Sequence, residues 1–173
     1  MAPPLNLVPQ VQLTSHNCLE GGIPPRFPSV IFHTTTSRGP SLGVNAAELA
    51  YRGHAHFGQF LHNNFDCPLP GCSKISLHLS WPGYPDCNTV FPIDVISPKG
   101  GPATRMDIII AIVEAITTFF QRACKHTVQA QHAQWKIAKD RDGIMVQDLW
   151  IISMNNKCGD MWQVDLNYIP SRH

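Results

Sequence analysis

The sequence predicts a single α+β domain, in which one long helix packs across one face of an antiparallel sheet. Three observations support this fold class. A long apolar pattern with helical spacing covers about residues 104–126, and segments on both sides of it alternate apolar and polar residues, as half-buried strands do. Turn-forming residues join these strands in pairs, which is typical of antiparallel hairpins. The length of 173 residues suits one hydrophobic core and is short for two.

The N-terminal region is rich in Pro, Gly, Ser and Thr and predicts an extended arm. Breakers at residues 24–28 and 37–40 flank one apolar stretch, residues 30–32, which we expect to form a strand. We therefore divide the chain into an arm, residues 1–28, and one α+β domain, residues 29–173. An arm of this composition rarely orders alone, so we expect it to pack on the domain or on a neighbouring molecule.

A short helix is expected over residues 46–52, because Asn45 can cap its first turn and Gly53 can end it. The following stretch, residues 54–65, fits neither the helical nor the strand period. A helix around residues 57–63 is the preferred interpretation of that stretch.

Two further strands are predicted between the short helix and the long helix. Residues 75–79 place Ile or Leu at every second position with polar residues between, which is the period of a half-buried strand. A Trp-Pro-Gly-Tyr-Pro turn follows at residues 81–85, and residues 90–95 form the second strand. Pro92 has no amide hydrogen, so this second strand belongs at an edge of the sheet or at a bulge.

The long helix begins at Thr104, which has the spacing of a capping box with Asp107. Apolar side chains extend beyond a single stripe along this helix, so we expect it to be buried on more than one side. Glu114 is an acidic residue within the apolar pattern. We expect it on a narrow exposed stripe; the alternative is a buried functional carboxylate.

Three strands are expected after the helix. Residues 135–137 form a short one, residues 140–143 form a turn, and two longer strands face each other across residues 155–160. In the last strand, Trp, Val, Leu and Tyr alternate with polar residues and share one face. One face of the sheet would then point outward, where the arm or a partner could cover it; it carries Ser76, His78, Asp165 and Asn167.

Composition and charge limit the partners. The chain has 13 Lys and Arg against 12 Asp and Glu, and only 14% of its residues are charged, so it lacks the basic field that grips nucleic acid. It also lacks an apolar run of about eighteen residues, so a membrane is not a predicted partner. Low charge favours self-association, and we predict a homo-oligomer or a protein partner.

The cysteines are expected to be reduced thiols in a soluble, cytoplasmic protein. The chain has six cysteines, but it starts without the basic and apolar regions of a signal peptide and carries no Asn-x-Ser/Thr acceptor. No sign of export therefore accompanies the cysteines.

A cluster of potential metal ligands comprises His54, His56, His62, Cys67 and Cys72. Imidazole and thiolate groups suit zinc or copper. If residues 54–56 are extended, the first two histidines project from the same side and can share an ion, whereas in a helix they cannot. The alternative is a set of surface histidines and buried free thiols.

A candidate anion site precedes the long helix and comprises Lys99, Gly100, Gly101, Thr104 and Arg105. Unpaired amides and the helix dipole favour an anion at such a position. The alternative is a loop that simply leads into a well-capped helix.

Trp81 and Tyr84 flank a Pro-Gly turn, and we predict that they are exposed and form a contact surface. Most other aromatic residues are expected to pack in the core. No motif places a nucleophile with a base, so a cysteine enzyme is disfavoured, and the sequence does not decide whether the protein is an enzyme.

Four short motifs lie between residues 75 and 168: Ser-Trp-Pro-Gly-Tyr at 80–84, Thr-Arg at 104–105, Trp135, and Asp-Met-Trp-Gln-Val-Asp at 160–165. With these motifs the chain resembles a group of small uncharacterised proteins of mushroom-forming fungi. The resemblance implies a fungal source and no particular activity.

The leading functional hypothesis is a non-catalytic binding or assembly module that acts through protein–protein contacts of its arm and sheet edge. One alternative is a small zinc- or copper-dependent enzyme that uses the histidine and cysteine cluster within residues 54–87. The other is binding of a small anionic ligand at residues 99–105. No cofactor is expected unless the metal cluster converges, in which case zinc or copper would be the metal.

Overall fold

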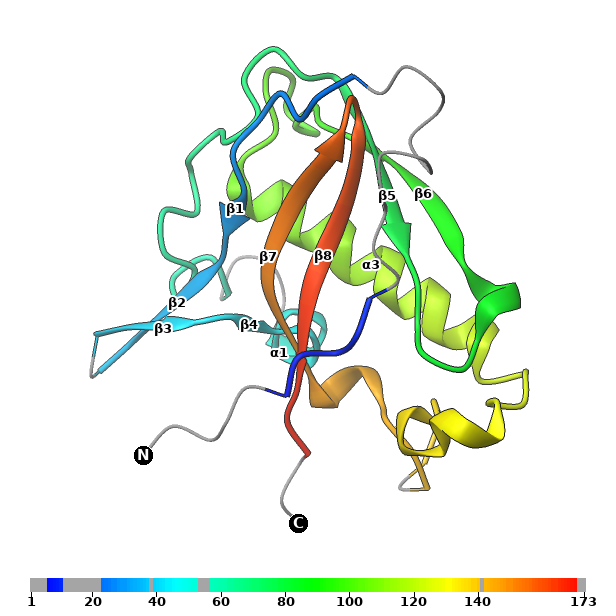
Figure 1. Cartoon of the computed structure of the whole chain (residues 1–173). Helices are drawn as coiled ribbons and strands as arrows, with labels where there is room; N and C mark the ends of the chain where they lie inside the picture. Colours follow the sequence, from blue (N-terminus) through cyan, green and yellow to red (C-terminus); the bar gives the residue numbers. More distant parts are fainter. Residues whose placement is uncertain (1–5, 11–22, 38, 53–56, 141, 171–173) are drawn as a thin grey trace.

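The computed structural model describes residues 6–10, 23–37, 39–52, 57–140 and 142–170. It confirms the α+β class, because one mixed sheet lies against a single long helix, α3 (Arg105–Ala123), which crosses behind the sheet in Figure 1. Within these described residues, no helix is long and apolar enough to cross a membrane.

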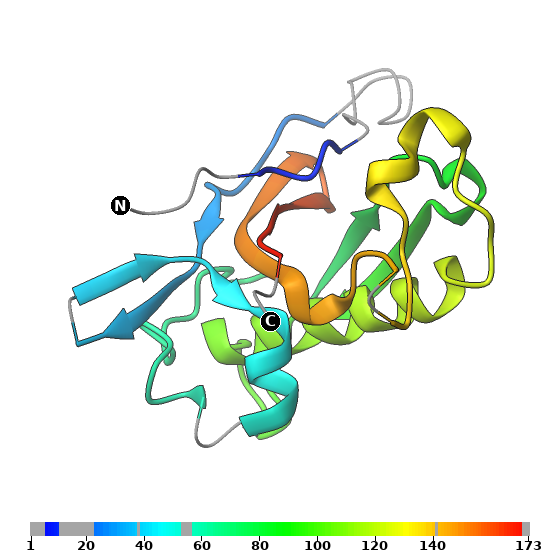
Figure 2. The ribbon, with the colours of Figure 1, turned by 90° about the horizontal axis from the view of Figure 1, so that it is seen from below.

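The main sheet places two hairpins side by side. Its strand order is β1-β7-β8-β5-β6, and β4 also pairs with β7. The strands are β1 (Val30–Ile31), β4 (Val44–Asn45), β5 (Lys74–Leu79), β6 (Thr89–Asp94), β7 (Leu149–Cys158) and β8 (Met161–Tyr168). A separate hairpin, which projects from the body in Figure 2, consists of β2 (His33–Thr36) and β3 (Gly39–Leu42).

One pair of strands, β5 and β8, is parallel, whereas the sequence predicts an antiparallel sheet. The hairpins β5–β6 and β7–β8 are each antiparallel, and α3 connects β6 to β7. This crossover leads from the β6 edge past the sheet to β7, so β8 lies beside β5 and runs in the same direction. β6 ends the strand order, in agreement with the edge position predicted from Pro92.

Helix α3 begins with the predicted capping box. The Thr104 hydroxyl accepts a hydrogen bond from the Asp107 amide at 3.2 Å, and the Asp107 carboxylate accepts one from the Thr104 amide at 2.9 Å. Glu114 is exposed, in agreement with the predicted solvent stripe. The buried residues of α3 are Ile108, Ile109, Ile112, Val113, Ala115, Ile116, Phe119, Phe120 and Ala123.

Helix α1 (Ala46–Arg52) has the predicted bounds and the predicted cap. The Asn45 side-chain oxygen accepts hydrogen bonds from the amides of Ala47 and Glu48, both at 3.0 Å. These bonds satisfy donors that the first turn of a helix leaves without partners. Gly53, the predicted end of this helix, lies outside the described residues.

The helix predicted around residues 57–63 is wrong beyond its first residue, because the chain there forms turns beside β2. The Thr35 amide donates to the Phe60 carbonyl at 2.6 Å, and the His62 amide donates to the His33 carbonyl at 2.9 Å. Backbone groups that bond to a neighbouring strand are no longer available for a helix.

Trp81 and Tyr84 are buried, so the predicted contact surface is wrong. They are 3% and 2% exposed. The Trp81 indole donates to the Trp135 carbonyl at 2.7 Å, and the Tyr84 hydroxyl accepts from the Ile137 amide at 2.9 Å. Burial raises the pKa of the Tyr84 phenol. Both rings hold the segment between α3 and β7 against the core.

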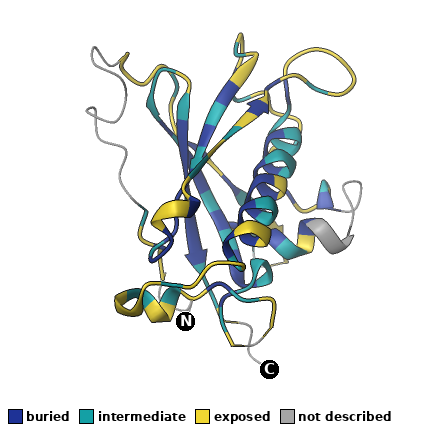
Figure 3. Cartoon of the chain, turned by 90° about the vertical axis from the view of Figure 1, so that its right-hand side faces the viewer, coloured by how far each residue is buried: buried dark blue, intermediate teal, exposed yellow. Residues whose placement is uncertain are grey.

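That segment contains a 3-10 helix where a strand is predicted at residues 135–137. The helix, η2 (Ala130–Trp135), includes the first residue of the predicted strand, and Ile137 forms an isolated bridge with Ile144. The other short helices are η1 (Pro85–Cys87) and η3 (Val146–Asp148). Burial is concentrated along the strands of the main sheet, whereas the loops at its ends are exposed (Figure 3).

The described parts of the arm pack on the domain. The Val8 amide donates to the Leu166 carbonyl at 2.8 Å, and the Tyr168 amide donates to the Asn6 carbonyl at 2.9 Å. Residues 6–8 therefore lie beside β8. Apart from residues 6–10 and the segment described next, the arm lies outside the described residues.

A second arm segment, residues 23–28, covers the turn between β7 and β8. The Arg26 amide donates to the Asn156 side-chain oxygen at 2.6 Å, and the ring centre of Phe27 lies 6.1 Å from that of Trp162. Trp162 has no exposed surface, so this segment helps to close one end of the core.

Candidate functional site

The predicted metal ligands form no three-ligand cluster within the described part of the chain. His54 and His56 lie outside it, and among the described residues no group of three His, Cys, Asp or Glu could hold a metal ion. The Cys67 sulfur lies 3.8 Å from the Pro102 carbonyl oxygen, and the Cys72 sulfur lies 3.3 Å from the Lys74 carbonyl oxygen. His62 faces a different neighbour, His33, whose ring centre is 6.5 Å away.

The predicted anion site has its helix-start amides already bonded. The amides of Thr104 and Asp107 are used by the capping box, the Arg105 amide donates to the Asp66 carbonyl at 2.6 Å, and the Met106 amide donates to the Asn64 carbonyl at 3.1 Å. An anion at this helix start therefore finds these four donors occupied.

The remaining residues of that predicted site separate in space. Lys99, Gly100 and Gly101 form an exposed turn, in which the Gly100 amide donates to the Ser97 carbonyl at 2.8 Å. The Arg105 side chain instead donates to the Ile31 carbonyl at 2.8 Å, at the other side of the helix start.

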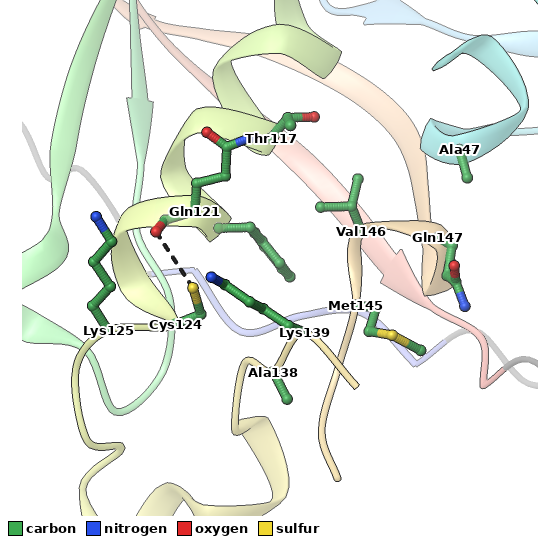
Figure 4. Close-up of a pocket in the computed structure, with 11 residues that line it drawn as sticks. Ala47, Thr117, Gln121, Cys124, Lys125, Ala138, Lys139, Met145, Val146 and Gln147 are labelled. Atoms are coloured by element: carbon green, nitrogen blue, oxygen red, sulfur yellow. Dashed lines mark hydrogen bonds between the residues drawn. The ribbon is translucent and has the colours of Figure 1, made fainter. Parts of the chain in front are cut away.

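A groove of about 670 Å³ opens beside the C-terminal half of α3 (Figure 4). This volume lies within the range of small-molecule sites. The end of α3, residues 138–139 and residues 145–147 build its walls, with one residue from α1. The lining residues are Ala47, Thr117, Phe120, Gln121, Cys124, Lys125, Ala138, Lys139, Met145, Val146 and Gln147.

The floor of the groove is apolar. Phe120 belongs to the buried side of α3 and is 5% exposed, and its ring and that of Trp81 pack edge to face with centres 5.0 Å apart. Met145 and Val146 are half-buried and line the groove from the other wall. A ligand with a hydrocarbon part would remove apolar surface from water here.

Hydrogen bonds hold the wall that faces α3. The Met145 amide donates to the Asp148 carboxylate at 3.0 Å, which fixes the start of η3. The Asn45 side chain, which also caps α1, donates to the Gln147 carbonyl at 2.9 Å. The groove therefore has a shape set by α1, α3 and η3 before any ligand enters.

Two lysines give the groove its charge. Lys125 and Lys139 are both exposed, and the Lys139 side chain extends toward the end of α3 in Figure 4. Among the described residues that line the groove, none carries a carboxylate. Lys125 also follows the C-terminal end of α3, where a cation offsets the helix dipole. The groove therefore combines an apolar floor with positive charge.

Cys124 places a thiol in the same groove. It is a free, half-buried cysteine, and its sulfur lies 3.3 Å from the Gln121 carbonyl oxygen. The sequence gives no motif for this groove, because its residues come from separate segments. The one sequence feature that could have indicated the groove is the spacing of Gln121, Cys124 and Lys125. Residues three and four positions apart lie on the same side of a helix.

Cys158 takes part in a disulfide bond, so the expectation of six reduced thiols is wrong for this residue. Cys67, Cys72, Cys87 and Cys124 are free. The chain therefore combines a disulfide with free thiols, one of which lines the groove.

Comparison with known proteins finds no matching family model, no matching curated protein and no matching solved structure.

Proposed function

We propose that the protein is a non-catalytic binding module for a small amphipathic anion, which it holds in the groove beside α3. The supporting observation is that an apolar floor and two lysines occur together, without a carboxylate among the described lining residues. A hydrocarbon chain would pack on Phe120, Met145 and Val146, where each buried methylene group contributes about 0.8 kcal/mol. The anionic head group would pair with Lys139.

Two features favour a small ligand over association through the arm and the sheet edge. The described arm residues direct several backbone hydrogen bonds to their own domain. The open edge strand β6 carries Pro92 and an exposed Asp94, whose carboxylate lies 3.8 Å from the Lys74 amino group. Proline and charge on an edge strand oppose pairing with a strand of another molecule.

Titration calorimetry with decanoate tests this proposal, with decyltrimethylammonium as a probe of the same chain length and opposite charge. We expect the wild-type protein to bind decanoate more tightly than the cation. Lys139→Glu should weaken decanoate binding about tenfold or more, because attraction is replaced by repulsion.

Lys136→Glu is the matched control. Lys136 is exposed, lies three positions before Lys139, and is not among the groove residues. The same change of charge there should leave the decanoate affinity within about twofold, since exposed charges at a distance are screened. Equal losses in the two variants, or equal wild-type affinity for the two probes, would contradict the proposal.

A further inference from the structure

A second cavity, of about 480 Å³, lies at the opposite end of α3 from the groove. It is bounded by β1, β2, the loop after Leu61 and the first residue of α3. Its polar lining residues are Ser29, His33, His62, Asn63 and Arg105. The sequence assigns Arg105 to an anion site and His62 to a metal site, and the fold brings both residues into this one cavity.

Arg105 is held in place by its surroundings. Its side chain is 15% exposed, with Nη1 donating to the Ile31 carbonyl at 2.8 Å and Nη2 donating to the Asp66 carboxylate at 3.3 Å. Its Nε is buried and has no hydrogen-bond partner among the described residues. A guanidinium carries more N–H donors than these two bonds use. Arg105 therefore presents a guanidinium of fixed position at the cavity, and its charge is partly offset by Asp66.

The loop that carries His62 is shaped by Asn63. Asn63 has a φ of 54°, in the left-handed region, and its carbonyl accepts a hydrogen bond from the Asp66 amide at 3.0 Å. Asparagine tolerates this conformation better than most residues. The resulting turn brings Asp66 to Arg105 and leaves His62 at the cavity.

His33 and His62 stand beside each other at the cavity. Their rings meet edge to face with centres 6.5 Å apart, and the His62 amide donates to the His33 carbonyl at 2.9 Å. Imidazole groups supply ring N–H donors, and a protonated imidazole adds positive charge. Among the described lining residues of this cavity, none is acidic.

The chemistry of the cavity suits an anion better than a metal ion. Two imidazoles could begin a metal site, but the described part of the chain supplies no third ligand, and the guanidinium would repel a cation. Guanidinium geometry matches the oxygens of phosphate, and arginine is common where phosphate is recognised. The cavity is also larger than inorganic phosphate requires, and Pro28, Ile31 and Pro68 line it.

We infer that this cavity is a second binding site, for an organic phosphate monoester whose phosphoryl group is held by Arg105, His33 and His62. The organic part would lie against Pro28, Ile31 and Pro68. The site depends on side chains and does not use the amides at the start of α3, which are bonded within the protein. It is separate from the groove, so it does not rest on the function proposed above.

Titration calorimetry of the full chain with phenyl phosphate, inorganic phosphate and zinc chloride tests the inference. We expect phenyl phosphate to bind more tightly than inorganic phosphate, and zinc to bind more weakly than about 1 mM at this site. Arg105→Gln should abolish phenyl phosphate binding. His62→Gln should weaken it about fivefold, which corresponds to about 1 kcal/mol.

Two histidine variants separate binding from folding. His62 is exposed, so His62→Gln tests the site without removing the hydrogen bonds that Arg105 makes to Ile31 and Asp66. His126→Gln is the matched control, because His126 is an exposed histidine outside the cavity, and it should bind phenyl phosphate like the wild type. Absence of phenyl phosphate binding in the wild type would overturn the inference. Unchanged binding in His62→Gln, or zinc binding that this variant loses, would overturn it as well.

Discussion

His78 lies on β5, and its Nδ1 is 3.4 Å from the Nε2 of Gln163 on the neighbouring strand β8. Gln163 is 2% exposed, and residues 6–10 of the arm run close by, with Gln10 and Gln163 lining one small cavity. Burial lowers the pKa of His78 from its usual value of 6.5. The folded protein therefore holds this imidazole in its neutral form over a wider pH range than the unfolded chain does.

This shift predicts an acid-sensitive contribution to stability. Because the folded-state pKa of His78 is below the unfolded value, the contribution is present above pH 6.5 and is lost as the pH falls through the folded-state pKa. We expect His78→Gln to lose less unfolding free energy than the wild type between about pH 7.5 and about pH 5. Urea unfolding at both pH values measures this difference. An identical acid loss in the two proteins would count against the assigned role of His78.

The cysteines should differ in reactivity. Cys67 is exposed, whereas Cys87 is 8% exposed, and burial together with the nearby Asp86 raises the pKa of the Cys87 thiol. The thiolate is the reactive form, so iodoacetamide at neutral pH should label Cys67 first and Cys87 last. Cys158 should be labelled only after reduction. Peptide mass spectrometry over time gives this order, and early labelling of Cys87 would show that the region around it opens.

At the scale of single elements, local chemistry was sufficient for the best predictions. The Asn45 cap of α1, the capping box of α3 and the alternation in β5 each depend on residues a few positions apart, and all are confirmed. The failures have a different origin. Residues 58–63 bond to β2, and Trp135 is held by Trp81, so distant partners determine their conformation.

Gly83 and Gly100 have nearly equal φ angles but different surroundings, so substituting each distinguishes the effect of backbone strain from that of packing. Gly83 has a φ of +84°, and an added Cβ would lie 2.6 Å from Val128 and 2.8 Å from His132. Gly100 has a φ of +82°, and a Cβ there would meet no atom of the described residues within 4 Å. Gly83 therefore allows the segment after α3 to pack against the turn that follows β5.

We expect Gly100→Ala to lower the free energy of unfolding by about 1–2 kcal/mol, which is the cost of the left-handed conformation alone. Gly83→Ala should cost more than about 3 kcal/mol, because the overlap with Val128 and His132 is added to that strain. Chemical denaturation of both variants checks the difference. Similar losses of unfolding free energy in the two variants would mean that the segment after α3 moves to accommodate the added Cβ without a measurable loss of stability.

At the scale of the whole molecule, the sequence predicts the two hairpins and the helix but not how they join. The parallel pairing of β5 with β8 brings together His78 and Gln163, which are 85 positions apart. A period-two pattern shows which residues share a face of a strand, but it is the same for a parallel and an antiparallel neighbour. The parallel direction of β5 and β8 therefore depends on how α3 connects the two hairpins, which the alternation pattern does not report.

The residues of the two proposed binding sites also come together through tertiary contacts that the sequence patterns do not report. The sequence patterns indicate Arg105 and His62 as members of two different sites, and no pattern indicates His33. Their convergence depends on backbone bonds between β2 and the loop after Leu61. The groove residues Lys125 and Lys139 do not form a sequence motif. The chain between them passes through η2 and then returns to the end of α3, which brings the two lysines to one groove. Patterns along a chain do not report such tertiary contacts.

Helix α3 also sets the distance between the two sites. It has 19 residues, which at a rise of 1.5 Å per residue span about 28 Å. The screening length in a solution of physiological ionic strength is about 8 Å. Two anions bound at opposite ends of this helix would therefore repel each other very little through the solvent. If both proposed sites bind as inferred, the protein would hold both anions at once, and the concentration of one would not limit the occupancy of the other.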